Sequence, residues 1–330
     1  MSVTKLPFEK IKRALFIKKK SKTESKFGIN PDERPVDELI NFGIVNINKP
    51  KGPTSHQVSA YVQKILKIKK SGHSGTLDPK VTGVLPVALG RGTRVVQALL
   101  KAGKEYVCIM HLHKEVPEGK IRNTIKEFVG KIRQLPPLRS SVKRQERTRK
   151  IYYIKILEIQ DKDVLFVVGC QAGTYIRKLC HDIGKKLGVG AHMAELVRTK
   201  AGPFNDKETV TLQDLADSFW YYNNENNEKF IRHCIKPIES GVDHLPKIFV
   251  LDTTVDTLCH GADLKVPGVS MIDSEIQCDE NIAIMTLKGE LVAIGTSRMV
   301  SKEVVKKEKG VVASTDKVFM LPGTYPKIQK

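Results

Sequence analysis

The chain has 330 residues, of which 40% are hydrophobic and 28% charged, and its 56 lysines and arginines against 36 acidic residues give a formal net charge of +20. Its length allows two domains with a substantial core, and no apolar run approaches the ~20 residues that cross a membrane. So large a positive charge favours a polyanionic partner, usually nucleic acid, over a basic surface that binds nothing.

The N-terminus and the cysteines narrow the protein class further. LPFEKIKRALFIKKKSK (6–22) is rich in lysine but lacks the apolar core of a signal peptide, and its few serines argue against a transit peptide. The six cysteines show no C-x-x-C pair and no regular spacing, so neither a zinc site nor a disulfide framework is predicted. We expect an intracellular protein.

Short strands dominate the chain up to residue 188, with helices between them. Apolar or alternating runs bounded by turn residues predict strands at GIVNINKP (43–50), VLPVALG (84–90), KEYVCIMHLH (104–113), YYIKILEIQ (152–160) and DVLFVVGC (163–170). Helical spacing of apolar residues predicts helices at HQVSAYVQKILKI (56–68), RNTIKEFVGKI (122–132) and YIRKLCHDIGKKLG (175–188). Ser55 is the expected cap of the first helix and Gly188 the end of the third.

The last third of the chain differs in its sequence pattern. The polar tract YNNENNE (222–228) predicts an exposed loop, and after HLPK (244–247) short strands and glycine turns predict a small β-barrel of about 80 residues. We therefore predict a basic N-terminal extension (1–30), a first domain (31–246) and a barrel domain (247–330). The fold class is α+β, with a mixed, mainly antiparallel sheet and flanking helices.

Asp78, in SGHSGTLDPKVTG (71–83), is the single acidic residue between Glu38 and Glu105, a stretch that contains eleven lysines and arginines. Asp-Pro often begins a helix with the aspartate as N-cap, but Thr82-Gly83 would leave little helix to cap. Surrounding cations keep a carboxylate ionised, which suits a nucleophile better than a general acid. We therefore expect Asp78 to be catalytic.

The surroundings of Asp78 exclude some alternatives. A metal-dependent nuclease or a two-carboxylate glycosidase needs a further acid nearby, and only a distant residue could supply one. Gly90-Arg91-Gly92 lacks the third glycine of a dinucleotide fingerprint, because position 95 is valine. His111 and His113 could meet on one strand face, but no third metal ligand is visible, so we interpret them as structural. No metal and no cofactor are predicted.

A second site is expected where AGTYIR (172–177) leads from a strand into a helix. Arg177 falls in the first helical turn, where a cation opposes the helix dipole, so an anionic partner would explain its placement; the alternatives are solvent exposure and a structural salt bridge. Asp78 is an attractive partner, because a bidentate guanidinium would fix its orientation. Tyr106, at the start of a strand beside the basic region, could stack on a nucleobase or simply pack at the rim.

These residues resemble a known family. GHSGTLDPKVTGVLPVALG (72–90), KEYVCIMHLH, AGTYIRKL and GAHMAELVRTKAGPF (190–204) are similar, in this order, to the successive motifs of the TruB-type pseudouridine synthases, over roughly residues 40–245. Residues 247–325, with HGADLKVPGV and GELVAIGTS, resemble a PUA domain, a small RNA-binding β-barrel. The combination resembles the archaeal form of the dyskerin family, the catalytic subunit of box H/ACA guide-RNA particles.

The resemblance implies a role for each matching residue. Asp78 corresponds to the catalytic aspartate and Arg177 to its partner, and Tyr106 to the tyrosine that stacks on the target base and is a candidate for removing its C5 proton. His73 corresponds to the histidine near the flipped-out nucleotide, and the pocket would be completed by a second aromatic, Tyr175, and an apolar wall, Leu196. The basic segment 139–150 takes the place of a mobile thumb loop over the RNA. The expected RNA-contacting cations are Lys49, Arg139, Lys143, Arg144, Arg147, Arg149 and Lys150.

The implied reaction is the isomerisation of uridine to pseudouridine in rRNA, and possibly tRNA, chosen by an H/ACA guide RNA. Two alternatives stay open: a stand-alone tRNA pseudouridine synthase and a non-catalytic RNA-binding scaffold. The family implies small H/ACA protein partners: a zinc-binding or small scaffold protein, a subunit that aids turnover, and a kink-turn-binding protein that reaches the enzyme through the RNA. The N-terminal segment is expected to pack on the PUA domain, and the location to be cytoplasmic, or nucleolar if the protein is eukaryotic.

Overall fold

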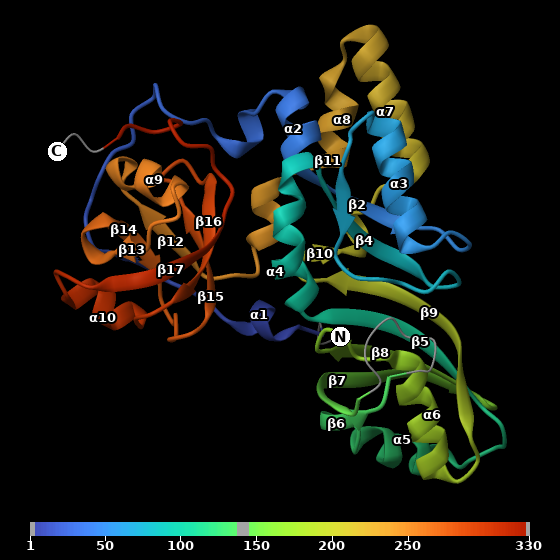
Figure 1. Cartoon of the computed structure of the whole chain (residues 1–330). Coiled ribbons are helices and arrows are strands. Elements are labelled where there is room, and N and C mark those ends of the chain that lie inside the picture. The colour runs from blue at the N-terminus through green and yellow to red at the C-terminus, as the bar shows by residue number, and fades with distance from the viewer. Residues whose placement is uncertain (1–3, 137–144, 328–330) are drawn as a thin grey trace.

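Two β-sheets organise the structure, a computed structural model in which residues 4–136 and 145–327 are described (Figure 1). Among these residues the larger sheet has ten strands, in the order β11-β2-β4-β9-β5-β8-β7-β6, with β3 beside β4 and β10 beside β9. They are β2 (Gly43–Lys49), β3 (Ser71–His73), β4 (Thr82–Leu89), β5 (Lys104–Leu112), β6 (Gly130–Gln134), β7 (Arg147–Gln160), β8 (Asp163–Cys170), β9 (Ala191–Ala201), β10 (Phe204–Asn205) and β11 (Ile235–Pro237). β4 and β9 pair in parallel, and the other neighbours run antiparallel.

The smaller sheet has seven strands within the described part of the chain, in the order β1-β14-β12-β15-β16-β17-β13. They are β1 (Leu15–Ile17), β12 (Lys247–Val250), β13 (Leu264–Lys265), β14 (Val269–Asp273), β15 (Asn281–Met285), β16 (Leu291–Ser297) and β17 (Val311–Val318). This sheet encloses its own apolar core, which includes Ile248, Ile284 and Val312. The N-terminal strand β1 pairs antiparallel with β14, so the N-terminal segment is part of this sheet.

Ten α-helices flank the two sheets in the described part of the chain. Their bounds are α1 (Pro7–Lys10), α2 (Val36–Phe42), α3 (Ser55–Leu66), α4 (Val96–Lys101), α5 (Glu118–Lys126), α6 (Ile176–Leu187), α7 (Leu212–Glu225), α8 (Glu228–Cys234), α9 (Asp252–Cys259) and α10 (Ser301–Lys306). α5 and α6 lie at one end of the larger sheet, against the core of β5 and β8, and α3, α7 and α8 lie at the opposite end (Figure 1). The predicted α+β class with a mainly antiparallel sheet is confirmed.

A buried ion pair joins the N-terminal segment to both sheets. Arg34 donates to Glu239 through two nitrogens, at 2.8 and 2.7 Å, and Glu239 also accepts the backbone N–H of Leu291 on β16 at 2.8 Å. Both charged side chains are almost fully buried. Nearer the N-terminus, the Thr4 hydroxyl donates to Glu105 on β5 at 3.0 Å, so the same segment contacts the larger sheet too.

Three local predictions differ from the structure. Thr54, and not Ser55, caps α3, because its hydroxyl accepts from Gln57 N–H in a reciprocal capping box. The helix predicted at 122–132 ends at Lys126, and Gly130, at φ +109°, begins β6 instead. The tract 222–228 is mostly helical, because α7 continues to Glu225 with its inner face packed on the core. None of the described helices is long and apolar enough to span a membrane.

Candidate active site

The loop between β3 and β4 carries Asp78, and a buried lysine holds it in place. The Lys49 ammonium, fully buried, donates to the carbonyl oxygens of Pro50 at 2.8 Å, Pro79 at 3.1 Å and Val81 at 2.8 Å. Burial lowers the pKa of Lys49, and the negative charge of Asp78 opposes that shift. The expectation that Lys49 contacts the substrate needs correction, because three carbonyls occupy its three N–H groups and no part of it is exposed.

Asp78 does not act as the cap of a helix. Residues 79–80 form a turn, and the chain enters β4 at Thr82. On the other side, the buried Leu77 donates its backbone N–H to the Ser55 hydroxyl at 2.8 Å, and that hydroxyl donates to the Leu77 carbonyl at 3.2 Å. Ser55 therefore anchors the loop directly before Asp78, a role that its position at a helix start does not reveal.

The Asp78 carboxylate forms a two-point ion pair with Arg177, the second residue of α6. Arg177 Nε lies 3.1 Å from Asp78 Oδ2, and Arg177 Nη2 lies 3.4 Å from Asp78 Oδ1. The two side chains keep 44% and 53% of their surface exposed. The pairing considered from sequence is therefore present, and it holds an accessible carboxylate in a fixed orientation, as bidentate guanidinium contacts do.

Arg198, which sequence reasoning missed, lies opposite Tyr106 in the register of β5 and β9. Its side chain is 1% exposed, and it donates to the Val84 carbonyl at 2.7 Å and to the Gly75 carbonyl at 3.2 Å. Burial raises the pKa of the Tyr106 hydroxyl, while the charge of Arg198 and its hydrogen bond to that hydroxyl oppose the shift. Arg198 thus links the Asp78 loop to Tyr106.

A second buried cation, Lys104, lies beside the same loop. Its ammonium donates to the carbonyls of Leu99, Leu100 and Ala102 at 2.8–3.0 Å, and burial, reinforced by Arg198, lowers its pKa to about 7. A Cβ atom on Gly75 would lie 3.8 Å from Arg198 and 4.0 Å from Lys104. Lys49 and Arg198 therefore support the loop through its carbonyl oxygens, whereas Lys104 binds the carbonyls at the end of α4 and lies beside Gly75.

His73 lies at the start of this loop and is partly buried. Its Nδ1 accepts the backbone N–H of Gly75 at 3.4 Å, and its ring meets the ring of His56 edge-on at 4.8 Å. Burial, with the positive charges of His56 and Arg198, lowers the pKa of His73 to about 4. The imidazole is therefore neutral near pH 7, which suits contact with an uncharged base.

Tyr175 and Leu196 frame the region from two other elements. The backbone N–H of Tyr175 donates to Gln134 Oε1 at 3.0 Å, and its carbonyl accepts from Gln134 Nε2 at 3.1 Å. This exchange with a buried amide fixes the turn that leads into α6 and Arg177. Leu196 is 8% exposed on β9 and belongs to the apolar core beside Tyr106.

The expected RNA-contacting cations divide between described and undescribed residues. Arg147, Arg149 and Lys150 lie on β7, where Arg149 Nε donates to the Gly173 carbonyl at 3.3 Å, close to the turn before α6. Arg139, Lys143 and Arg144 lie outside the described residues. Arg147, Arg149 and Lys150 therefore place positive charge on β7, the strand that follows the predicted thumb segment in the sequence.

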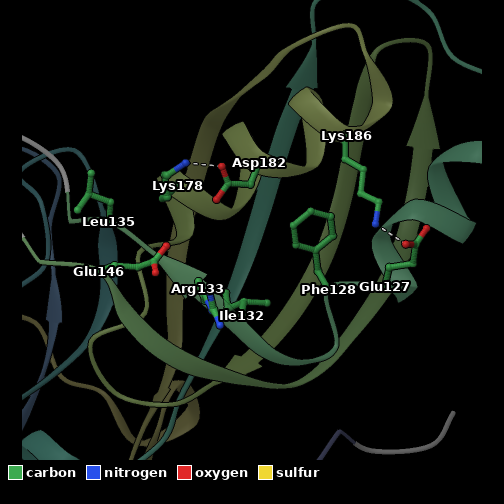
Figure 2. Close-up of a pocket in the computed structure, with 9 residues that line it drawn as sticks. All are labelled: Glu127, Phe128, Ile132, Arg133, Leu135, Glu146, Lys178, Asp182 and Lys186. Atoms are coloured by element: carbon green, nitrogen blue, oxygen red, sulfur yellow. Dashed lines mark hydrogen bonds and ion pairs between the residues drawn. The ribbon is translucent and has the colours of Figure 1, made fainter.

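A pocket of about 380 Å³ lies away from the Asp78 pair. Figure 2 shows the residues that line it. They are Glu127, Phe128, Ile132, Arg133, Leu135, Glu146, Lys178, Asp182 and Lys186. Lys178 and Lys186 are held there in ion pairs with Asp182 and Glu127, and Phe128 and Ile132 supply apolar surface (Figure 2). None of the predicted catalytic residues lines it, so we base the active site on the charge arrangement around Asp78.

His111 on β5 and His113, which directly follows that strand's last residue, each contact a neighbouring side chain. His111 Nδ1 lies 2.7 Å from Asp163 Oδ1, and His113 Nε2 lies 3.2 Å from Nδ1 of His192 on β9. In residues 4–136 and 145–327, no group of three or more histidine, cysteine or acidic side chains has the arrangement of a metal site.

Four family models match the chain. They are the N-terminal domain of the TruB family pseudouridylate synthases at residues 63–176, the tRNA pseudouridylate synthase B C-terminal domain at 177–243, the DKCLD domain at 4–59 and the PUA domain at 246–319. Together these matches cover nearly the whole chain in the order that the sequence motifs suggested.

Curated relatives and solved structures agree with these models. The chain is 53% identical over 323 residues to a probable tRNA pseudouridine synthase B of Methanopyrus kandleri, with 98% of this chain and 95% of the relative covered. It is 55% identical over 320 residues to a protein of the same name from Pyrococcus abyssi, with 96% of each covered.

Among solved structures, it matches a chain of an H/ACA RNP bound to a substrate RNA containing 2′-deoxyuridine, with a TM-score of 0.92, 51% identity and coverage of 99% and 100%. It also matches chains of an archaeal box H/ACA Nop10–Cbf5 complex, with a TM-score of 0.89, 52% identity and coverage of 97% and 99%, and of a Cbf5–Nop10–Gar1 complex, with a TM-score of 0.92, 53% identity and coverage of 97% and 98%.

Proposed function

This chain belongs to the TruB family of pseudouridine synthases and carries a PUA domain, and from that premise we propose that it isomerises uridine to pseudouridine at positions chosen by an H/ACA guide RNA. The accessible, arginine-paired Asp78 in a region of otherwise positive charge carries the proposal. Its likeness over nearly the whole chain to chains of an H/ACA RNP and of a box H/ACA Nop10–Cbf5 complex supports the dependence on a guide.

The reaction needs a carboxylate but consumes nothing. The bond between C1′ and N1 of uridine breaks, the uracil rotates, C5 bonds to C1′, and the proton that C5 loses is balanced by one gained at N1. Because uracil is not replaced by water, a second carboxylate to activate water is unnecessary. Asp78 would either add to the sugar or base or first remove a sugar proton, and in each case it must be ionised and free to reach the nucleotide.

Other residues of the site would hold the base. Tyr106 would stack on the flipped uracil, and burial raises the pKa of its hydroxyl, which is therefore protonated near pH 7. To receive the C5 proton, Tyr106 would first have to lose its own proton, and the charge of Arg198 would stabilise the resulting phenolate. Tyr175 and Leu196 would border the base. The neutral His73 would lie near the flipped-out nucleotide.

A guide RNA would lower the cost of presenting the base. Extracting a nucleotide from a helix costs a few kcal/mol, and least when it is already unpaired. A guide that pairs on both sides of the target uridine leaves it single-stranded, and lets a protein that contacts mainly phosphates act on a chosen site. Arg147, Arg149 and Lys150, with the basic segment before them, would supply such phosphate contacts.

The protein partners follow from the same proposal. Nop10 and Gar1 are present in the solved complexes of similar chains, and we propose that small proteins of this kind bind here. The kink-turn-binding protein would reach the enzyme through the guide RNA. The target is proposed to be rRNA, with tRNA as a further substrate.

A stand-alone tRNA pseudouridine synthase is the second candidate, because the curated relatives carry that name. The purified chain should be assayed on rRNA and tRNA fragments, with and without a matching guide RNA and the small proteins, and pseudouridine mapped by position. The proposal expects product at the guide-specified uridine only when the guide is present. Equal product at a fixed tRNA position without any guide would favour the second candidate.

A further inference from the structure

The helical hairpin of α7 and α8 exposes three aromatic side chains next to one another. Trp220, Tyr221 and Phe230 keep 54%, 37% and 43% of their surface exposed. The ring centroids of Trp220 and Tyr221 lie 5.3 Å apart, and those of Tyr221 and Phe230 lie 5.2 Å apart. We call these three residues the aromatic tip. The hairpin lies at the end of the molecule opposite α5 and α6 (Figure 1).

The contact between Tyr221 on α7 and Phe230 on α8 joins the two helices, but it leaves the outer faces of the three rings exposed. The inner face of α7 already meets the core through the buried Leu215 and through Phe219 and Tyr222. The Tyr222 hydroxyl also donates to Asp37 at 2.9 Å. α7 is therefore apolar on both its inner and its outer face, and clustered exposed aromatics of this kind mark interaction surfaces.

The charge around the aromatic tip indicates what the surface would bind. Residues 208–228 contain five acidic residues and no lysine, arginine or histidine, in a chain whose net charge is +20. Lys229 follows directly, and its Nζ lies 6.0 Å from the centroid of the Phe230 ring. Asp217 lies one helical turn before Trp220 and Tyr221, and Glu225 lies one turn after Tyr221, so two carboxylates and one lysine neighbour the rings. The excess of negative charge disfavours RNA phosphates, and it also disfavours a second copy of the same surface.

We infer that the aromatic tip, with Asp217 and Glu225, is a docking surface for a small basic protein. The partner would place an apolar side chain against the three rings and lysine or arginine side chains on the two carboxylates. This inference deepens the proposed function, because it assigns a surface to one of the small subunits, and it rests on that function for the choice of probe.

The chain carries its own reporter for this contact, because Trp220 is its single tryptophan. Purified Nop10 and Gar1, the small proteins named in the solved complexes, with any tryptophan replaced by phenylalanine, should be titrated separately into the full chain while its fluorescence is recorded. We expect one of them to shift the emission to shorter wavelength in a saturable way, with an affinity that falls as salt increases. The other protein serves as the comparison.

Two variants test which groups make the contact while Trp220 stays in place. The double change Tyr221→Ala with Phe230→Ala should weaken binding at least tenfold, and Asp217→Asn with Glu225→Gln should weaken it several-fold and flatten the salt dependence. Tyr61→Ala, which removes a single exposed aromatic of α3, is the matched control and should bind like the unchanged chain. Thermal unfolding of each variant, followed by circular dichroism, shows that the hairpin is intact.

Several outcomes would overturn the inference. These are an unchanged Trp220 emission with both proteins, equal binding by the double variants, a shift caused by guide RNA alone, or a shift that depends only on the concentration of the chain itself. Failure here is distinguishable from failure of the proposed function, because guide-dependent product can be measured in the same variants with the small proteins in excess.

Discussion

The loop region around Asp78 and the α7–α8 hairpin use charge in opposite ways. Residues 39–104 contain eleven basic residues and one acid, whereas residues 208–228 contain five acids and no base. Around Asp78 one exposed cation, Arg177, pairs with the carboxylate, and three further cations, Lys49, Lys104 and Arg198, are buried and bound to backbone carbonyls. The hairpin instead holds its carboxylates and its aromatic rings at the surface.

This difference shows that net charge alone does not identify a binding surface. A buried cation bound to carbonyls shapes the backbone and contributes little to RNA affinity, because phosphates cannot reach it. Exposed cations contribute to affinity through counterion release. Both Lys49 and Arg149 were predicted from sequence to contact RNA. Lys49 is fully buried, whereas the side chain of Arg149 is partly exposed on β7.

Among these variants, Asp78→Glu is expected to reduce the rate of pseudouridine formation most, although it preserves the negative charge of the loop. The added methylene moves the carboxylate and breaks the two-point geometry with Arg177, and a displacement of about 1 Å can reduce a rate about a hundredfold. We expect a loss of that size in single-turnover pseudouridine formation, with unchanged thermal stability. Full activity of this variant would mean that the position of the charge is unimportant.

Removing the buried guanidinium should have the next largest effect. Arg198→Met leaves the Val84 and Gly75 carbonyls without their donor, which we expect to cost about 2 kcal/mol of folding free energy. The rate at a temperature well below unfolding should fall at least about tenfold, because Gly75 and Tyr106 lose their link. Arg198→Lys, which keeps a cation but offers fewer donors, should be intermediate. An undiminished rate would limit Arg198 to a structural role.

The pH dependence of stability tests the state of His73. Its folded pKa of about 4 lies below the unfolded value near 6.5, so the unfolded chain binds more protons between these values. This residue should therefore lower stability as the pH falls from about 6.5 to 4, and should have no such effect above 7. His73→Asn should lose less stability over that window, measured by denaturant unfolding. Parallel curves would contradict the depressed pKa.

The smallest effect is expected at the hairpin. Asp217→Asn with Glu225→Gln changes exposed groups only, so the free energy of unfolding should change by no more than about 0.5 kcal/mol. Guide-dependent isomerisation should persist when the small proteins are in excess, and the salt dependence of RNA binding should be unchanged. A large loss of RNA affinity would show that this surface faces RNA and would remove the contrast between the two regions.

Much of the fold could be predicted because its patterns are local. The strands near 43–50 and 104–113 and the helix near 175–188 match β2, β5 and α6, since alternation and helical spacing are visible within each segment. The end of α7 and the start of α8 were missed because residues 223–228 are all Asn or Glu, and the apolar residues that pack inward, such as Phe219 and Ile231, lie on either side of that tract.

The site could be predicted only in part for a similar reason. The ion pair of Asp78 and Arg177 was considered because both residues looked unusual in their own segments. Arg198 and Lys104 gave no such signal, because their function depends on carbonyls brought close by the fold. The segment ELVRTKA (195–201) also carries Glu195 and Lys200, so nothing in it marks Arg198 as the buried cation.

The most direct test of the account measures RNA affinity and single-turnover product in the same samples, for the unchanged chain and for Asp78→Asn, each assembled with a guide RNA and the small proteins. The account predicts that the variant binds target RNA at least as tightly, because a negative charge has been removed from a phosphate-facing region, and yields no pseudouridine. Product at a comparable rate, or a loss of affinity large enough to explain the missing product, would contradict the assignment of the chemistry to Asp78.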